Sequence, residues 1–121
     1  MGDLAKKRLN SIADRLGIPS EIVEFGDYDP ATGTQQVTVI DSNVRSIIGN
    51  VEADLVGTES GVEVTDLVAT VPADDVSARP STTRFLRLVD SDDSYRIIQS
   101  GTHYAGKVKI GYNLIIRGGS D

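Results

Sequence analysis

His103 is the single histidine in a chain of 121 residues that has no cysteine, so it is the first residue to consider for chemistry. It lies in Ser100–Gly106, which we interpret as a loop between two strands. A serine nucleophile needs a histidine base that is itself held by a carboxylate. Ser100 is near in sequence, but no pattern marks a nucleophile elbow or an oxyanion turn. We therefore assign no catalytic residue and expect His103 to lie on the surface.

Three groups of aspartates could supply the oxygen ligands that calcium and magnesium prefer. The third group begins like an EF-hand loop but lacks the glycine and the distal glutamate of that motif. Aspartate also stabilises turns by bonding to backbone two residues on, which explains these residues without a metal. We predict no metal site at any of the three groups, Asp27/Asp29, Asp74/Asp75 and Asp90/Asp92/Asp93.

The glycines do not predict a phosphate-binding loop. Gly101, Gly106 and Gly111 do not lie on a turn that runs from a strand into a helix, as P-loop and dinucleotide motifs require. The formal net charge is −6, and the aromatic residues are not interleaved with lysine and arginine as in a surface that stacks on nucleic-acid bases. We expect no cofactor, no enzymatic activity and no sequence-specific reading of nucleic acid.

Length and composition bound the class of protein. A chain of 121 residues with 39% hydrophobic residues can form one domain, spanning residues 1–121, with its own core. No apolar run approaches the roughly 18 residues of a membrane span, and no signal-peptide pattern begins the chain. We therefore expect a reducing, cytoplasm-like setting and no membrane partner.

The first segment, residues 3–17, has the sequence of an α-helix. Asp3 is suited to cap its N-terminus, and a left-handed Gly17 followed by Pro19 is suited to end it. Apolar residues recur between these ends at helical spacing and predict one stripe that packs on the rest of the protein: Ala5, Leu9, Ile12, Ala13 and Leu16.

After the helix the chain changes to runs rich in β-branched residues, separated by turn-forming residues. Asp27–Gly33 predicts a turn, and Val37 and Val39 beyond it share one predicted strand face. The runs typical of strands are Glu21–Phe25, Gln35–Asp41, Ile47–Val56, Val62–Val71, Phe85–Val89, Tyr95–Gln99 and Lys107–Arg117.

The connections between these runs complete the predicted fold. Residues 57–61 predict a hairpin turn, residues 72–83 a long loop and residues 118–121 a flexible tail. The sum is a mainly β protein of the α+β class, with one N-terminal helix. Its residues 20–117 are predicted to form a small antiparallel β-barrel or sandwich of about six strands.

Charge is segregated along the chain. Four bases oppose two acids in residues 1–17, Arg45 alone opposes twelve acids in residues 18–76, and seven bases oppose four acids in residues 77–121. Solvated faces that keep the protein dispersed explain this pattern. Complementary patches explain it too, because a repeated head-to-tail contact between two different patches can close a ring. Both interpretations stay open.

The order of elements in the C-terminal third is typical of a known family. Arg84–Val89, an acidic turn, Tyr95–Ile98, a glycine-containing loop and the closing strand Tyr112–Arg117 follow one another. This order resembles the head–tail connector proteins of tailed bacteriophages, the head-closure (stopper or joining) group similar to the phage lambda head–tail joining protein family. The upstream helix, the strand Gln36–Ile40 and the acidic hairpin are also similar. The chain departs from the family at Pro80–Thr83, where the family has Gly-Asp.

The resemblance implies a structural protein of the virion neck that is assembled in the host cytoplasm. It implies a homo-oligomeric ring, a hexamer or dodecamer, between the portal or adaptor ring and the tail. Genomic DNA would pass through its channel without sequence readout. Together with the charge pattern, it predicts contacts to neighbouring subunits or rings through Lys6, Lys7, Arg8, Arg15, Asp74, Asp75, Arg79 and Arg84.

Two alternatives accompany this interpretation. A tail terminator or another small tail protein would share the size and the β content. A stand-alone ligand-binding β-domain is the second alternative, although the absence of tryptophan removes the aromatic platform that carbohydrate-binding modules usually display.

Overall fold

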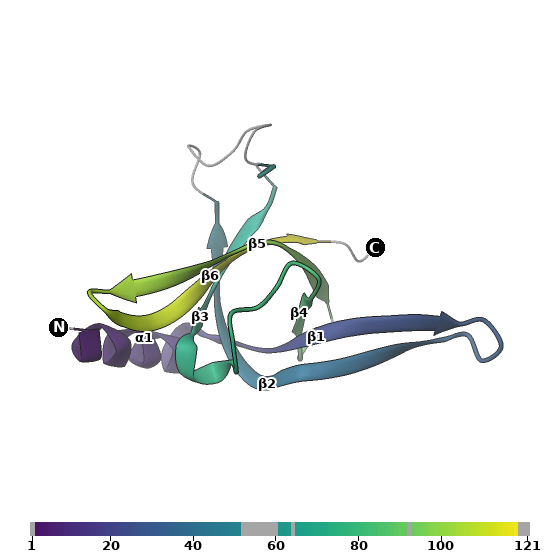
Figure 1. Cartoon of the computed structure of the whole chain (residues 1–121), viewed down its shortest axis with the longest axis horizontal. Helices are drawn as coiled ribbons and strands as arrows, with labels where there is room; N and C mark the ends of the chain where they lie inside the picture. The colour runs from purple at the N-terminus through teal and green to yellow at the C-terminus, as the bar shows by residue number, and fades with distance from the viewer. Residues whose placement is uncertain (1, 52–60, 64, 92, 119–121) are drawn as a thin grey trace.

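The computed structural model describes residues 2–51, 61–63, 65–91 and 93–118 (Figure 1). These residues form one α-helix followed by six antiparallel strands, so the predicted mainly β class with an N-terminal helix is confirmed. The elements are α1 (Gly2–Leu16), β1 (Ile18–Asp29), β2 (Thr34–Asn50), β3 (Leu67–Pro72), the 3₁₀ turn η2 (Ala73–Asp75), β4 (Phe85–Leu88), β5 (Ser94–Ala105) and β6 (Val108–Gly118).

The six strands form one closed sheet in the order β1-β2-β3-β6-β5-β4. The short strand β4 completes it, because Phe85 pairs with Val23 of β1 on one side and with Arg96 of β5 on the other. Successive side chains of a strand point to opposite faces. The inward apolar side chains make up most of the core: Ile22, Val44, Ala69, Val71, Leu86, Ile97, Tyr112, Leu114 and Ile116.

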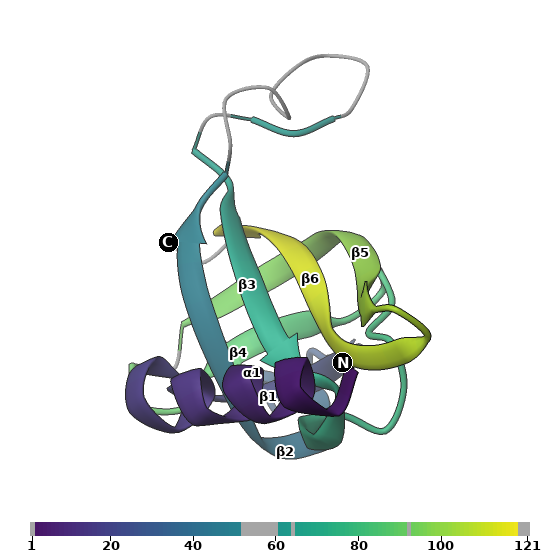
Figure 2. The same ribbon diagram turned by 90° about the vertical axis from the view of Figure 1, so that its left-hand side faces the viewer.

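The helix α1 lies across the outside of β3 and β6 (Figure 2). Ala13 is buried and Leu9 reaches Gly111 of β6, as the predicted apolar stripe requires. Ile12 and Leu16 were placed in the same stripe, but they are 37% and 64% exposed, so that part of the prediction is wrong. A helix meets the convex outside of a closed sheet along a narrow line, which leaves the flanks of its apolar face uncovered.

Both ends of α1 differ from the prediction. The helix begins at Gly2, so Asp3, the predicted cap position, lies within its first turn. Gly17 does not adopt a positive φ, because the chain passes directly into β1. A Cβ atom on Gly17 would lie 2.3 Å from the carbonyl oxygen of Ala13 and 2.8 Å from Cβ of Arg45. Glycine is therefore needed here for close approach and not for left-handed geometry.

The strands β1 and β2 continue beyond the closed sheet as a projecting two-stranded arm, which we define as residues 24–39 (Figure 1). The two strands predicted at Gln35–Asp41 and Ile47–Val56 are parts of one strand, since β2 runs unbroken from Thr34 to Asn50. Asn43 lies between them with a φ of 58° and does not end the strand. The predicted turn is confirmed in its shorter form, residues 30–33.

The segment predicted as a loop around His103 is part of β5, which runs to Ala105. His103 pairs with Gly111 of β6, and the turn is shortened to two residues with Gly106 at a φ of 63°. The sequence of this strand is rich in glycine and has few apolar residues, so its pattern does not predict a strand. Pairing with β6 holds it in place, and the intrinsic strand propensity of its residues does not.

Two other predicted connections are partly outside the described residues. The structure does not describe residues 57–60 of the predicted hairpin turn or residues 119–121 of the predicted tail. The foot of that hairpin is confirmed by the pairing of β2 with β3 from Ile47↔Thr70 to Asn50↔Leu67. Gly118 was placed in the tail, but it is the last residue of β6. The predicted loop 72–83 begins with η2 and is therefore partly structured.

Replacement of Gly111 by alanine tests how closely α1 and the sheet pack. Its Cβ would lie 2.6 Å from the carbonyl oxygen of Val71 and 2.8 Å from Cδ2 of Leu9. We expect Gly111→Ala to lower the free energy of unfolding by about 2 kcal/mol, since overpacking forces the backbone to move. Urea denaturation measures this. Gly49→Ala is the matched control, because nothing lies within 4 Å of its Cβ position; an equal loss in both variants would contradict the explanation.

Candidate interaction surfaces

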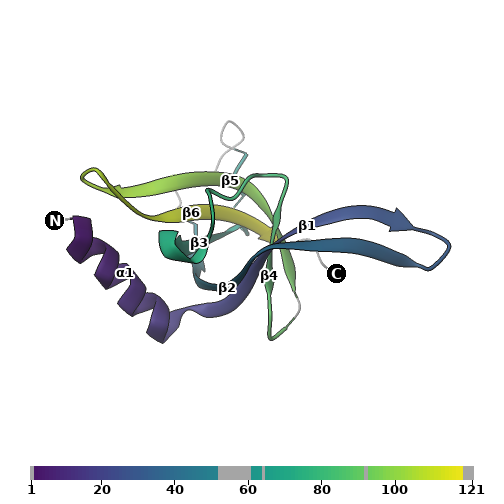
Figure 3. The same ribbon diagram turned by 60° about the horizontal axis from the view of Figure 1, so that its bottom comes forward.

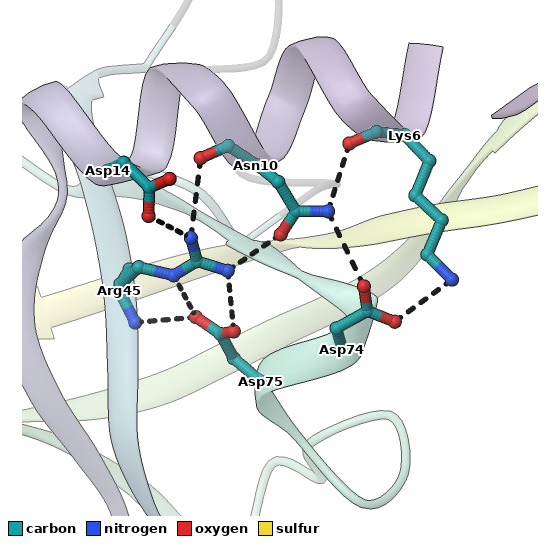
Figure 4. Close-up of polar contacts among 6 residues, drawn as sticks. All are labelled: Lys6, Asn10, Asp14, Arg45, Asp74 and Asp75. Atoms are coloured by element: carbon teal, nitrogen blue, oxygen red, sulfur yellow. Dashed lines mark hydrogen bonds and ion pairs between the residues drawn. The ribbon is translucent and has the colours of Figure 1, made fainter. Parts of the chain in front are cut away.

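One arginine joins three segments of the chain. The guanidinium of Arg45, on β2, donates two hydrogen bonds to the Asp75 carboxylate of η2, Nε to Oδ2 at 2.9 Å and Nη2 to Oδ1 at 2.8 Å (Figure 4). It also donates to Asn10 Oδ1 of α1 at 2.6 Å and forms an ion pair with Asp14. The hydrogen bond to Asp75 is the main cause that raises the pKa of Arg45, so the group is charged at every ordinary pH.

A second ion pair extends this network along α1. Nζ of Lys6 lies 2.9 Å from Oδ1 of Asp74, and Asn10 Nδ2 donates to the other carboxylate oxygen at 3.4 Å (Figure 4). The hydrogen bond from Lys6 lowers the pKa of Asp74. We call Lys6, Asn10, Asp14, Arg45, Asp74 and Asp75 together the Arg45 network.

The Arg45 network accounts for three of the eight predicted contact residues, Lys6, Asp74 and Asp75. A fourth, Arg84, has its Nε 3.5 Å from Oε2 of Glu24, an ion pair without a hydrogen bond. These four charged side chains, which the sequence predicts to contact neighbouring subunits, therefore form ion pairs within one chain. In the described part of the chain, no ion pair involves the other four predicted contact residues, which are exposed: Lys7, Arg8, Arg15 and Arg79.

Three of those four bases lie on α1 beside uncovered apolar side chains. Leu4 is 54% exposed, in addition to Ile12 and Leu16. Next to them a shallow groove runs between α1 and the β5–β6 turn. We call it the helix groove, and it is lined by Leu4, Ala5, Arg8, Leu9, Ile12, Ala105 and Gly106.

The projecting arm carries a second uncovered apolar surface. Phe25 pairs with Val37 and Tyr28 with Gln35, and directly opposed residues of an antiparallel pair share a side of the sheet. Alternation then places Val37, Val39 and Gln35 on that same side. Val37, Val39 and Tyr28 are 40%, 43% and 61% exposed. We call this side, formed by Phe25, Tyr28, Val37 and Val39, the arm face.

The two apolar surfaces lie at opposite ends of the molecule. Figures 1 and 3 both place α1 and the β5–β6 turn at one end of the long axis and the tip of the arm at the other. Their charges are opposite as well. The arm carries Glu24, Asp27 and Asp29 and no base, whereas the exposed side of α1 carries Lys7, Arg8 and Arg15.

The sequence predicts only part of these surfaces. The alternation of Val37 and Val39 predicts a shared face, but not that the face extends past the closed sheet into solvent. The exposed flank of α1 was missed, because Ile12 and Leu16 fit the same helical spacing as the buried Ala13. The apolar stripe of the helix is wider than the strip of surface that one helix buries against a curved sheet, and this width is the signal that could have predicted the exposed flank.

The residues considered for catalysis are not brought together. His103 is exposed, and its Nδ1 lies 3.3 Å from Nδ2 of Asn113. The Oδ1 of the same asparagine accepts a hydrogen bond from the Thr70 hydroxyl at 3.0 Å. The hydroxyl of Ser100 is buried and has no hydrogen-bond partner among the described residues. Within that same part of the chain, no three acidic or histidine side chains gather as a metal site would require.

The comparisons with known proteins add no relative to this picture. No protein-family model, no curated protein sequence and no solved structure matches this chain. The one helix among the described residues is too short and too polar to cross a membrane.

The matched pair Asp75→Asn and Asp74→Asn tests the Arg45 network. The Asp75 side chain is 9% exposed and that of Asp74 is 53% exposed. We expect Asp75→Asn to lower the free energy of unfolding by about 2 kcal/mol, because it leaves a half-buried arginine without its main partner. Asp74→Asn should cost less than about 1 kcal/mol, as surface ion pairs do. Urea denaturation of both variants measures the difference, and equal losses would contradict the assigned roles.

A second buried carboxylate predicts a pH dependence. Asp66 is buried and accepts two hydrogen bonds from Arg117 at 2.9 Å and one from the backbone N–H of Glu63 at 2.9 Å. The hydrogen bonds from Arg117 are the main cause that lowers its pKa below the usual value of about 3.9. The stabilisation is therefore present above that value and is lost as pH falls through the lower pKa of the folded state.

Asp66→Asn isolates this contribution. The wild-type protein should be more stable than the variant at pH 7, and the difference should shrink as the pH is lowered to about 3. Urea denaturation at a series of pH values measures both proteins. A difference that stays constant across the series would show that the ionised Asp66 carboxylate does not stabilise the fold.

Proposed function

We propose that this protein is a ring-forming structural subunit of the virion neck, a head–tail connector of the head-closure (stopper) kind. One observation carries the proposal. The arm face and the exposed flank of α1 lie at opposite ends of the molecule, and both carry uncovered apolar side chains. The charged residues beside them have opposite signs, acidic on the arm and basic on α1. Exposed apolar patches of this kind mark protein contacts. Two different patches make a head-to-tail contact, and its repetition forms a ring when the rotation closes.

We infer the kind of ring from the resemblance in the order of elements. The order of the N-terminal helix, the following strands and the acidic hairpin resembles that of phage head–tail connectors. The six-stranded closed sheet with its N-terminal helix supports this resemblance. In such a ring the subunit joins the portal or adaptor to the tail. Arg79, exposed in the connection between η2 and β4, stays a predicted contact to a neighbouring subunit or ring.

The charge of the chain supports passage of DNA in place of binding. With a net charge of −6, a ring of identical subunits repels the phosphates of a duplex in its channel. Genomic DNA would then slide through without being held or read. Reading of bases would require side chains that reach into a groove, which a repelling channel wall disfavours.

Measurement of mass in solution tests the ring. We expect the concentrated protein, alone or mixed with purified portal and tail rings, to form one closed species of six or twelve subunits. Native mass spectrometry counts the subunits, and negative-stain electron microscopy shows whether the species has a central opening wide enough for a duplex. A monomer under all of these conditions, or an open filament, would contradict the proposal.

Reversal of one charge tests the contribution of α1. Arg8→Glu should shift assembly to at least tenfold higher protein concentration, because it places an acid where the acidic arm of a neighbour is expected. Arg8→Lys is the matched control, because it keeps a positive charge at the same position on α1. Light scattering over a concentration series measures assembly. Equal behaviour of the two variants would show that α1 does not contribute through its charge.

A further inference from the structure

We propose that the arm of one copy seats the arm face in the helix groove of the next copy. This inference rests on the proposed ring and specifies the contact that would build it. The occupant of the groove is a second copy of this chain and not another protein.

The helix groove exposes apolar side chains that a two-stranded ribbon could cover. Its floor is the line along which α1 meets the sheet, where Leu9 lies against Gly111. Its open side exposes Leu4 and Ile12 next to the tight turn at Gly106. A Cβ on Gly106 would meet nothing within 4 Å, so the turn leaves this end of the groove open.

The arm has one apolar side and one polar side. Val37 and Val39 lie on the arm face, whereas Thr38 pairs with Glu24 on the opposite side. At the foot of the arm, Phe25 packs edge-on against Phe85 of β4, with the ring centres 4.8 Å apart. That contact holds the near end of the arm face to the closed sheet. Val37, which pairs with Phe25, and Tyr28, which lies nearer the tip, remain exposed.

Charge favours this pairing over an arm against an arm. Residues 18–44 contain no lysine, arginine or histidine, so two arms would bring like charges together. The groove, in contrast, is lined by Arg8 of α1, and Lys107 follows Gly106 at the β5–β6 turn. The nearby Asp14 is already paired with Arg45 and does not offset these bases fully. Opposite charges fix the partner and the orientation of such a contact.

The absence of native cysteine allows a direct crosslinking test. Val37→Cys places a thiol on the arm face, and Ile12→Cys places one in the helix groove; both sites are exposed. The two single variants are mixed and treated with a short bismaleimide, which spans more than a disulfide and so does not depend on exact register. We expect a covalent dimer in the mixture and little in either variant alone, at least tenfold less on a denaturing gel.

Each outcome of this test has a distinct meaning. A dimer from Val37→Cys alone would show that arms meet arms, which overturns the inference. No crosslink in the mixture, although native mass spectrometry shows rings, would also overturn it and would leave the proposed function standing. No crosslink together with no assembly would count against both. Val37→Cys mixed with Thr82→Cys, an exposed position in the β3–β4 connection, controls for random collision.

A matched pair of arm variants tests the same contact without crosslinking. Val37→Asp and Gln36→Asp add the same charge to adjacent exposed residues on opposite sides of the arm. We expect Val37→Asp to raise the concentration needed for assembly at least tenfold, and Gln36→Asp to change it less than about threefold. Circular dichroism with thermal melting verifies that both variants fold. Equal effects of the two variants would show that the arm face is not buried in the ring.

Discussion

The Arg45 guanidinium holds the parts of this protein in the arrangement on which its surfaces depend. It bonds to Asp75 of η2 and to Asn10 and Asp14 of α1 from its place on β2. Without it, α1 would be held by the narrow apolar line at Leu9 and Ala13 and by the contacts of Lys6 and Asn10 with Asp74. Because the guanidinium is anchored by a carboxylate that is itself buried, the helix has a fixed rotation about its axis. That rotation decides which side chains of α1 face solvent.

Closure of the sheet explains why the charge blocks of the sequence do not survive as blocks in space. Antiparallel pairing brings the acidic first half of the chain against the basic second half. Glu21 of β1 meets Arg87 of β4 at 2.7 Å, and Asp66 before β3 meets Arg117 of β6 at 2.9 Å. The sequence shows the opposite charges but not the register that pairs them. Among the described residues, the charges that form no ion pair include Lys7, Arg8 and Arg15 on α1 and Asp27 and Asp29 on the arm.

Sequence patterns predicted the fold better than the surfaces. The helix, most strands and the turn at residues 30–33 follow from local spacing and turn chemistry, which are properties of neighbouring residues. Strand ends were misplaced where partners impose them: His103 lies in a strand because β6 pairs with it, and β2 continues through Asn43. Exposure is a property of the whole molecule. Val37 in the arm and Val44 in the core fit equally well with a strand, yet they are 40% and 0% exposed.

The continuity of β1 and β2 has a mechanical consequence. The same two strands form the arm and part of the closed sheet, so no loop separates the arm from the core. A force applied at the tip reaches Val23 and Val44 through unbroken backbone and through hydrogen bonds that lie across the direction of pull. Ladders loaded in this way share the load over many bonds at once. A displacement of the arm would therefore be transmitted directly to the two strands that carry Val23 and Val44 of the core.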